Sequence, residues 1–304
     1  MAGVACLVVA AVTAWGLAYP QNSLGTTLVR STADCAAVVT LGLLLVPWFD
    51  DRRYRDGLAD LAARPLTVVC AVWVVGELVR LFTGAAAAAG ASTWRVGVRT
   101  TVEFAVDTAA GRADLVCLAA AAVVCVVTAS APGLARPGSA IGVVAVGSAA
   151  LGIAGRSLVG HLSESPLGGV AVAVHALAAA VWCGTLAALV LTVTHRGQWA
   201  RVLPRFSQAS LGCVAVLLVF GVAGAFVTLE SPAALFDTGY GRVLAAKIVV
   251  TAALVWLAWR NRAGWLPAAQ SHRATAGASR TRSRIELAVM AVALTLAAAL
   301  TVTG

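Results

Sequence analysis

The sequence predicts an all-α fold, a polytopic transmembrane bundle of about nine membrane-spanning helices. Sixty per cent of its 304 residues are hydrophobic and only 12% are charged, whereas roughly a quarter of the residues of a soluble domain are charged. The apolar residues also form runs of about 20, which is the length that crosses a bilayer as a helix. Too few polar side chains remain to cover a water-soluble globule, so the composition excludes one.

The candidate spans follow one another along the whole chain. They are 2–19, 31–49, 65–83, 112–130, 139–157, 168–194, 207–229, 241–259 and 284–303. The first run has no basic segment before it and no small-residue cleavage site, so we interpret it as a retained span rather than a signal peptide. The segment 84–111 is richer in charge, and within it residues near 93–108 predict an amphipathic helix at the outer membrane surface.

The basic residues predict the orientation. The net charge is +9, and fourteen of the 22 Lys and Arg residues fall in connections that are cytoplasmic if the N-terminus is cytoplasmic. Cytoplasmic loops of membrane proteins carry such an excess. We therefore expect a multi-pass protein of the bacterial plasma membrane with the N-terminus inside and the C-terminus outside. The positive charge then belongs to loops, and no nucleic-acid partner is expected.

Ionisable side chains inside spans are costly and therefore informative. With this orientation they all fall in the outer third of the bilayer. They are Asp34, Glu77, Arg80, Asp114, His175 and Lys247. This pattern predicts a polar cavity open to the extracytoplasmic side. In the simpler alternative Glu77 and Arg80, three residues apart, neutralise each other, and Arg80 and Asp114 extend to the interface.

His175 is the histidine placed most clearly within a span, ~10 Å from its outer end. Trp182 follows seven residues later, within about 20° of the same helix face. Cys183 lies ~12 Å from His175 along the axis, so both can bind one ion only if the helix breaks. His161 reaches His175 only if the loop 157–167 folds inward. Imidazole suits copper, zinc and haem iron, but a hydrogen bond between helices is the alternative for His175, and a packed thiol is the alternative for Cys183.

The second half of the chain carries a set of ordered residues on consecutive spans. They are Gly160-His161, His175, Trp182, Gly184, Leu186, Arg205-Phe206-Ser207, Gly221, Gly224, Tyr240-Gly241-Arg242, Leu244, Lys247 and Asn261-Arg262. In this order they resemble the CopD family of copper resistance and copper uptake membrane proteins. The resemblance covers roughly 155–304, which we treat as a CopD-like domain, and 1–154 as a domain of N-terminal spans.

The resemblance implies that the protein handles copper taken from the extracytoplasmic side. His161 and His175 then become the leading copper ligands, with Glu164 and Cys183 as further ligands along the path. Cavity or structural roles fall to the remaining polar and family positions. These are Asp34, Glu77, Arg80, Trp182, Arg205, Tyr240, Arg242 and Lys247.

The implied partners are the lipid bilayer, an extracytoplasmic copper chaperone and a CtaG-like protein of cytochrome oxidase assembly. The chain resembles either the N-terminal half of a CopD–CtaG fusion of actinobacterial type or a free-standing version of that half. Two other functions remain open, a haem or quinone redox protein with paired histidines and a scaffold that transports nothing. The hydrolase, zinc-protease and nucleotide-binding motifs that would indicate an enzyme are absent from the sequence.

Overall fold

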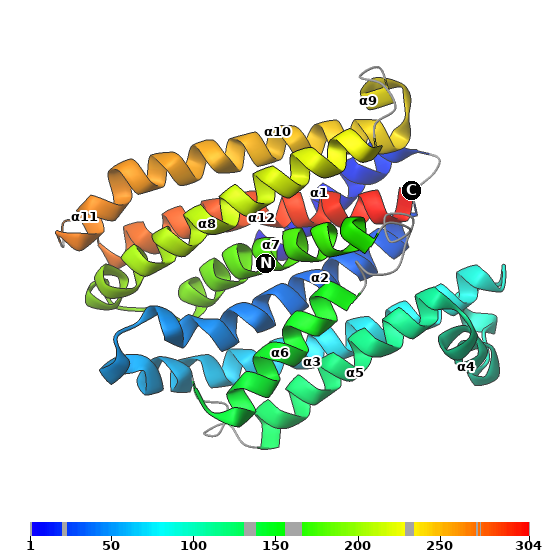
Figure 1. Cartoon of the computed structure of the whole chain (residues 1–304), viewed down its shortest axis with the longest axis horizontal. Coiled ribbons are helices and arrows are strands. Elements are labelled where there is room, and N and C mark those ends of the chain that lie inside the picture. Colours follow the sequence, from blue (N-terminus) through cyan, green and yellow to red (C-terminus); the bar gives the residue numbers. More distant parts are fainter. Residues whose placement is uncertain are drawn as a thin grey trace.

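The computed structural model describes residues 2–19, 23–130, 138–155, 166–228, 234–271, 273 and 275–303. Within these ranges every regular element is a helix, which confirms the all-α prediction. Long helices run back and forth between two ends of an elongated bundle (Figure 1). Short helices and turns lie at those ends and connect the long helices.

The long helices are α1 (Ala2–Ala18), α2 (Leu24–Leu45), α3 (Arg55–Ala88), α5 (Ala109–Ser130), α6 (Ala140–Gly155), α7 (Pro166–Thr192), α8 (Arg196–Thr228), α10 (Gly239–Arg260) and α12 (Ala276–Thr303). The short ones are η1 (Val46–Phe49), η2 (Arg52–Tyr54), η3 (Thr93–Arg95), α4 (Val98–Asp107), α9 (Ala234–Asp237), the π-turn η6 (Asn261–Trp265) and α11 (Leu266–Gln270).

Each predicted span lies on one long helix, so the protein is a multi-pass membrane protein. In the described ranges, seven helices are long and apolar enough to cross a membrane, namely α2, α3, α5, α7, α8, α10 and α12. The other two, α1 and α6, are equally apolar but have only 17 and 16 residues. The span predicted at 65–83 was too short, because α3 continues over 34 residues from Arg55 to Ala88. Helical hydrogen bonding continues past the point where the apolar run ends.

The predicted amphipathic segment corresponds to α4, which packs on α3 and α5. Thr101 and Ala105 face these helices and are buried. Val98, Val102 and Val106 follow one another at four-residue intervals on an adjacent face and are 53–75% exposed. An exposed apolar stripe of this kind is typical of a helix lying in the membrane interface.

The central helix is α2, which contacts α1, α3, α6, α7 and α12. Its closest neighbour is α7, where the two backbones meet at Gly42 and Gly184. A Cβ atom on either glycine would collide with the backbone of the other helix. Small residues permit such close crossings in membranes. Because α2 and α7 run in the same direction, Asp34 and His175 lie at similar distances from this crossing, eight and nine residues away.

The two ends of the bundle differ in what they carry (Figure 1). At one end, called the α11 end, lie η1, η2, α11 and the turn between α7 and α8. At the other end, called the α9 end, lie α4, α9 and the final residues of α1 and α12. These two names are used below.

Candidate functional site

The candidate copper ligands His175 and Cys183 both lie on α7. This helix is unbroken from Pro166 to Thr192, so the two side chains stay ~12 Å apart along its axis and cannot bind the same ion. The other two candidate ligands, His161 and Glu164, lie outside the described residues.

His175 points from α7 toward α8. A Cβ atom built on Gly221 of α8 would lie 3.3 Å from Cε1 of the imidazole and 3.8 Å from Nδ1. Gly221 therefore leaves just enough room for the ring between the helices. Nδ1 is buried and has no hydrogen-bond partner among the described residues, although buried polar atoms are normally paired. The imidazole also interacts with the backbone of Leu217 on α8, so the ring nitrogen left without a partner is Nδ1.

A third helix contributes Lys247. This residue of α10 is partly buried and interacts electrostatically with the His175 imidazole. Lys247 forms no ion pair within the described part of the chain. The structure therefore brings His175 of α7 against Gly221 of α8, with Lys247 of α10 within electrostatic range, although the three residues are widely separated in sequence. This group is called the His175 site below.

Trp182 and Cys183 lie deeper in the helical core. Both side chains are buried, with 4% and 7% of their surface exposed. The Cys183 thiol has Cys35 of α2, Cys213 of α8 and Glu286 of α12 in its electrostatic neighbourhood. These groups surround Cys183 without converging, since the described residues contain no set of three His, Cys, Asp or Glu side chains able to hold one metal ion.

The other polar residues near the α9 end pair with one another. Arg80 of α3 donates a hydrogen bond to Asp114 of α5, at 3.2 Å. The second terminal nitrogen of Arg80 lies 3.5 Å from one carboxylate oxygen of Asp34 on α2. The other carboxylate oxygen of Asp34 lies 3.7 Å from Nε of Arg30. Three helices are therefore joined through one guanidinium.

Glu77 has a different partner from the one considered for it. Its carboxylate accepts a 2.8 Å hydrogen bond from the indole of Trp73, one turn earlier on α3. Both side chains are almost completely buried. The sequence suggested a pair between Glu77 and Arg80, but Arg80 instead reaches α2 and α5.

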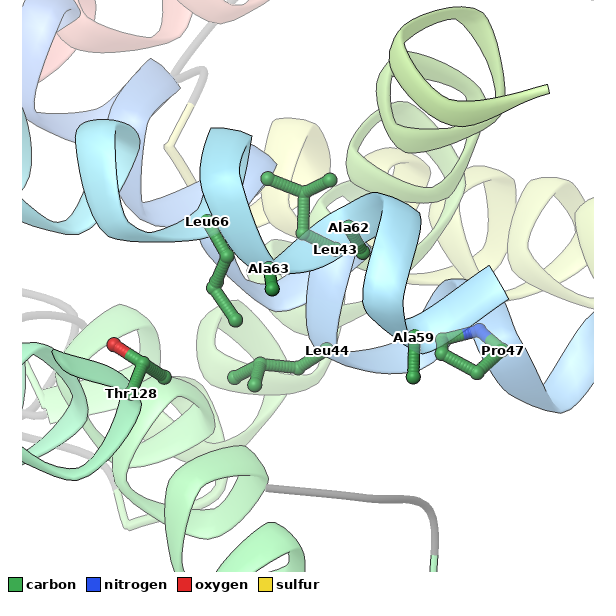
Figure 2. Close-up of a pocket in the computed structure, with 8 residues that line it drawn as sticks. All are labelled: Leu43, Leu44, Pro47, Ala59, Ala62, Ala63, Leu66 and Thr128. Carbon is green, nitrogen blue, oxygen red and sulfur yellow. The ribbon is translucent and has the colours of Figure 1, made fainter. Parts of the chain in front are cut away.

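Two pockets among the described residues are apolar, and neither contains the ionisable residues assigned to a cavity. Figure 2 shows the first, at the α11 end between α2, α3 and α5. It is lined by Leu43, Leu44, Pro47, Ala59, Ala62, Ala63, Leu66 and Thr128. Its volume is about 20 Å³, room for about one water molecule. This pocket offers no ligands for copper beyond one hydroxyl.

Comparison with known families gives one match. Residues 200–300 match the family model described as copper resistance protein D, CopD. Over these residues the chain is similar to the CopD family. No curated protein and no solved structure matches the chain. The matched residues run from α8 to α12 and include Gly221 and Lys247 of the His175 site, while His175 itself precedes them.

Residues 200–300, called the CopD region below, are joined by hydrogen bonds between helices at the α11 end. Arg262 of η6 donates to the backbone carbonyl of Ser207 at 2.9 Å and to its hydroxyl at 2.7 Å. Asn261 beside it donates to the buried carboxylate of Glu286 on α12, at 2.8 Å. Two short motifs that carry the family resemblance are therefore in direct contact and hold α8, α10 and α12 in place.

Arg205 connects the CopD region to the N-terminal half. It donates to the carboxylate of Asp51 at 2.7 Å. Four residues earlier, Arg201 forms two hydrogen bonds with the buried carboxylate of Asp50, at 2.8 and 3.1 Å. This second pair was not predicted, because its members are 151 positions apart. The one available sign in the sequence was that two acidic residues, Asp50 and Asp51, directly follow the predicted span 31–49.

Arg242 and Tyr240 lie at the α9 end. Nε of Arg242 donates to the carbonyl of Leu17 at the end of α1, at 2.8 Å. The ring of Tyr240 packs against the small core formed by α1, α10 and α12. These two positions therefore attach α1 to the CopD region.

Proposed function

We propose that this CopD-like protein moves copper ions from the α9 end into the membrane, with His175 as a ligand inside the bundle. The observation that carries the proposal is the unused Nδ1 of His175 beside Gly221. Imidazole nitrogen is a common ligand of copper. The similarity of residues 200–300 to the CopD family indicates that copper is the metal. In this proposal copper is the transported substrate and not a resident cofactor.

The surroundings of His175 suit a site that releases its ion. The Lys247 ammonium lies in its electrostatic neighbourhood, and two positive charges in a medium of low dielectric constant repel each other strongly. Copper bound at His175 is therefore held weakly and passes on. A next ligand is available in Cys183, eight residues further along α7, because thiolates are soft ligands that favour Cu(I).

The carboxylates near the α9 end give copper a first attraction. Asp34 is 30% exposed and Asp114 is 13% exposed. Copper approaching these groups competes with Arg80 for their negative charge. We further propose that the α9 end faces outward, that an extracytoplasmic chaperone supplies the ion, and that a CtaG-like partner receives it for oxidase assembly.

Copper accumulation in cells tests the proposal. His175→Ala should lower accumulation to that of cells without the protein, in a host that lacks its own copper uptake. The reason is that methyl replaces the nitrogen ligand. His195→Ala, in the exposed turn before α8, should accumulate copper as wild type does. Both variants should be present in the membrane at wild-type amounts.

The two alternative functions, a scaffold and a haem protein, predict different results for the same variant. Normal copper accumulation by His175→Ala would contradict the proposal and favour a scaffold. A haem protein would show a visible absorption band on purification that His175→Ala removes. Because His175 is the only histidine within a membrane-spanning helix in the described ranges, a haem with two histidine ligands would need His161.

A further inference from the structure

A groove in the membrane-spanning surface lies between α1, α10 and α12. Its volume is about 390 Å³, and it is lined by Val9, Ala10, Thr13, Ala246, Val250, Val292 and Leu296. The Thr13 hydroxyl is the one polar side-chain group in this lining, and it donates to the carbonyl of Val9 in its own helix, at 2.9 Å. The groove therefore presents apolar surface alone, of a shape that a hydrocarbon chain can fill.

The guanidinium of Arg242 lies beyond the groove lining, toward the α9 end. Arg242 precedes Ala246 and Val250 at four-residue intervals on α10, so all three lie on one helix face. Across the groove, Arg242 donates to the carbonyl of Leu17, one turn beyond Thr13 on α1. A second nitrogen donates to the carbonyl of Phe236 at 3.4 Å. Both partners are neutral, and no carboxylate among the described residues forms an ion pair with Arg242.

Aromatic residues place Arg242 at the depth of lipid headgroups. Trp15 of α1 and Tyr19, directly after this helix, are exposed and meet edge to face, with ring centroids 5.6 Å apart. Tyr240 lies two residues before Arg242. Tryptophan and tyrosine gather where the hydrocarbon region meets the headgroups. The positive charge is therefore at the interface and the apolar groove runs from it into the hydrocarbon.

We propose that this groove binds one anionic phospholipid, with the phosphate on Arg242 and an acyl chain along α1, α10 and α12. Arginine pairs well with phosphate because its planar group offers several donors. The lipid would fill the gap beside α1, which packs against α10 and α12 through the small core of Ala14, Ala18, Val243 and Leu300. This site is independent of the copper pathway.

Native mass spectrometry of the purified full-length chain tests the site. Phosphatidylglycerol and phosphatidylcholine with identical acyl chains are added at equal concentrations. Wild type should retain phosphatidylglycerol preferentially, and Arg242→Gln should reduce that preference about tenfold, the equivalent of one charge-assisted hydrogen bond. Arg242→Lys should keep most of the preference. Ala246→Trp should lower the binding of both lipids, because the indole occupies the groove.

The matched control is Arg112→Gln. Arg112 also lies at the α9 end and donates to a carbonyl six residues earlier, at 3.1 Å, but its helix, α5, does not line the groove. This variant should bind both lipids as wild type does. An unchanged lipid preference in Arg242→Gln, or an equal loss in Arg112→Gln, would overturn the proposal. A lipid-free dimer that Ala246→Trp disrupts would also overturn it, because a second copy of the chain would then occupy the groove.

Discussion

Gly221 determines how much room the His175 imidazole has between α7 and α8. A Cβ atom at this glycine would lie 3.3 Å from Cε1 of the ring, closer than an ordinary van der Waals contact. A methyl group there requires a shift of a few tenths of an ångström, but a branched side chain requires the imidazole to leave its place. The glycine therefore shapes the His175 site without supplying a ligand.

Gly221→Val should consequently lower copper accumulation nearly as far as His175→Ala does. The valine methyls occupy the space of the imidazole and turn its nitrogens away from the interior. The measurement is cellular copper by elemental analysis, with membrane abundance checked in parallel. Gly212→Val is the control, because Gly212 lies on the same helix with nothing within 4 Å of its would-be Cβ. Equal accumulation by the two variants would contradict the role given to Gly221.

At the scale of elements, the junction between η1 and η2 is held to α8 by two ion pairs of unequal burial. Asp50 is 1% exposed and is paired with Arg201, whose guanidinium also lies 4.0 Å from the centre of the Tyr54 ring. Asp51 and Arg205 are 42% and 47% exposed. Buried pairs lose much more than exposed ones when one partner is removed. The first pair is therefore the main link between the two halves at this end.

Asp50→Ala should lower the free energy of unfolding by about 2 kcal/mol, because it leaves a partly buried guanidinium without its carboxylate. Asp51→Ala should lower it by less than about 1 kcal/mol, since water screens that pair. Detergent-solubilised protein titrated with a denaturing detergent gives both values. Equal losses in the two variants would show that burial does not distinguish the pairs.

At the scale of the whole molecule, the arginine-rich connections gather at the α11 end, together with η1, η2 and α11 (Figure 1). The positive-inside tendency predicts that this end is cytoplasmic. A cytoplasmic α11 end places Arg242, the His175 site and the carboxylates of Asp34 and Asp114 nearer the outer surface. The direction of copper movement proposed above depends on this orientation.

Cysteines placed at the two ends test it in intact cells with a maleimide that does not cross the membrane. Ala91→Cys and Asp237→Cys, both exposed at the α9 end, should react. His195→Cys and Ser271→Cys, exposed at the α11 end, should react only after the membrane is opened. The reverse pattern would place the α11 end outside and would require the copper pathway to be drawn in the opposite direction.

The sequence by itself determined the class of protein, the number and order of the long helices and the amphipathic α4. These follow from local properties, since about 20 consecutive apolar residues have no stable alternative to a spanning helix in a bilayer. Residue type alone also singled out His175 and Lys247, because ionisable groups are rare within spans. The ordered residues of the second half likewise led to the CopD family, which the match at residues 200–300 supports.

Only the tertiary structure decided which side chains meet. It placed Gly221 against His175 and Lys247 within electrostatic range of it, joined Arg80 to Asp34 and Asp114, and paired Asp50 with Arg201 across 151 positions. A helix that is apolar on every side carries no periodic pattern to mark the face that packs. The contacts between such helices depend on small residues such as Gly42 and Gly184, whose effect becomes visible only when two backbones approach each other.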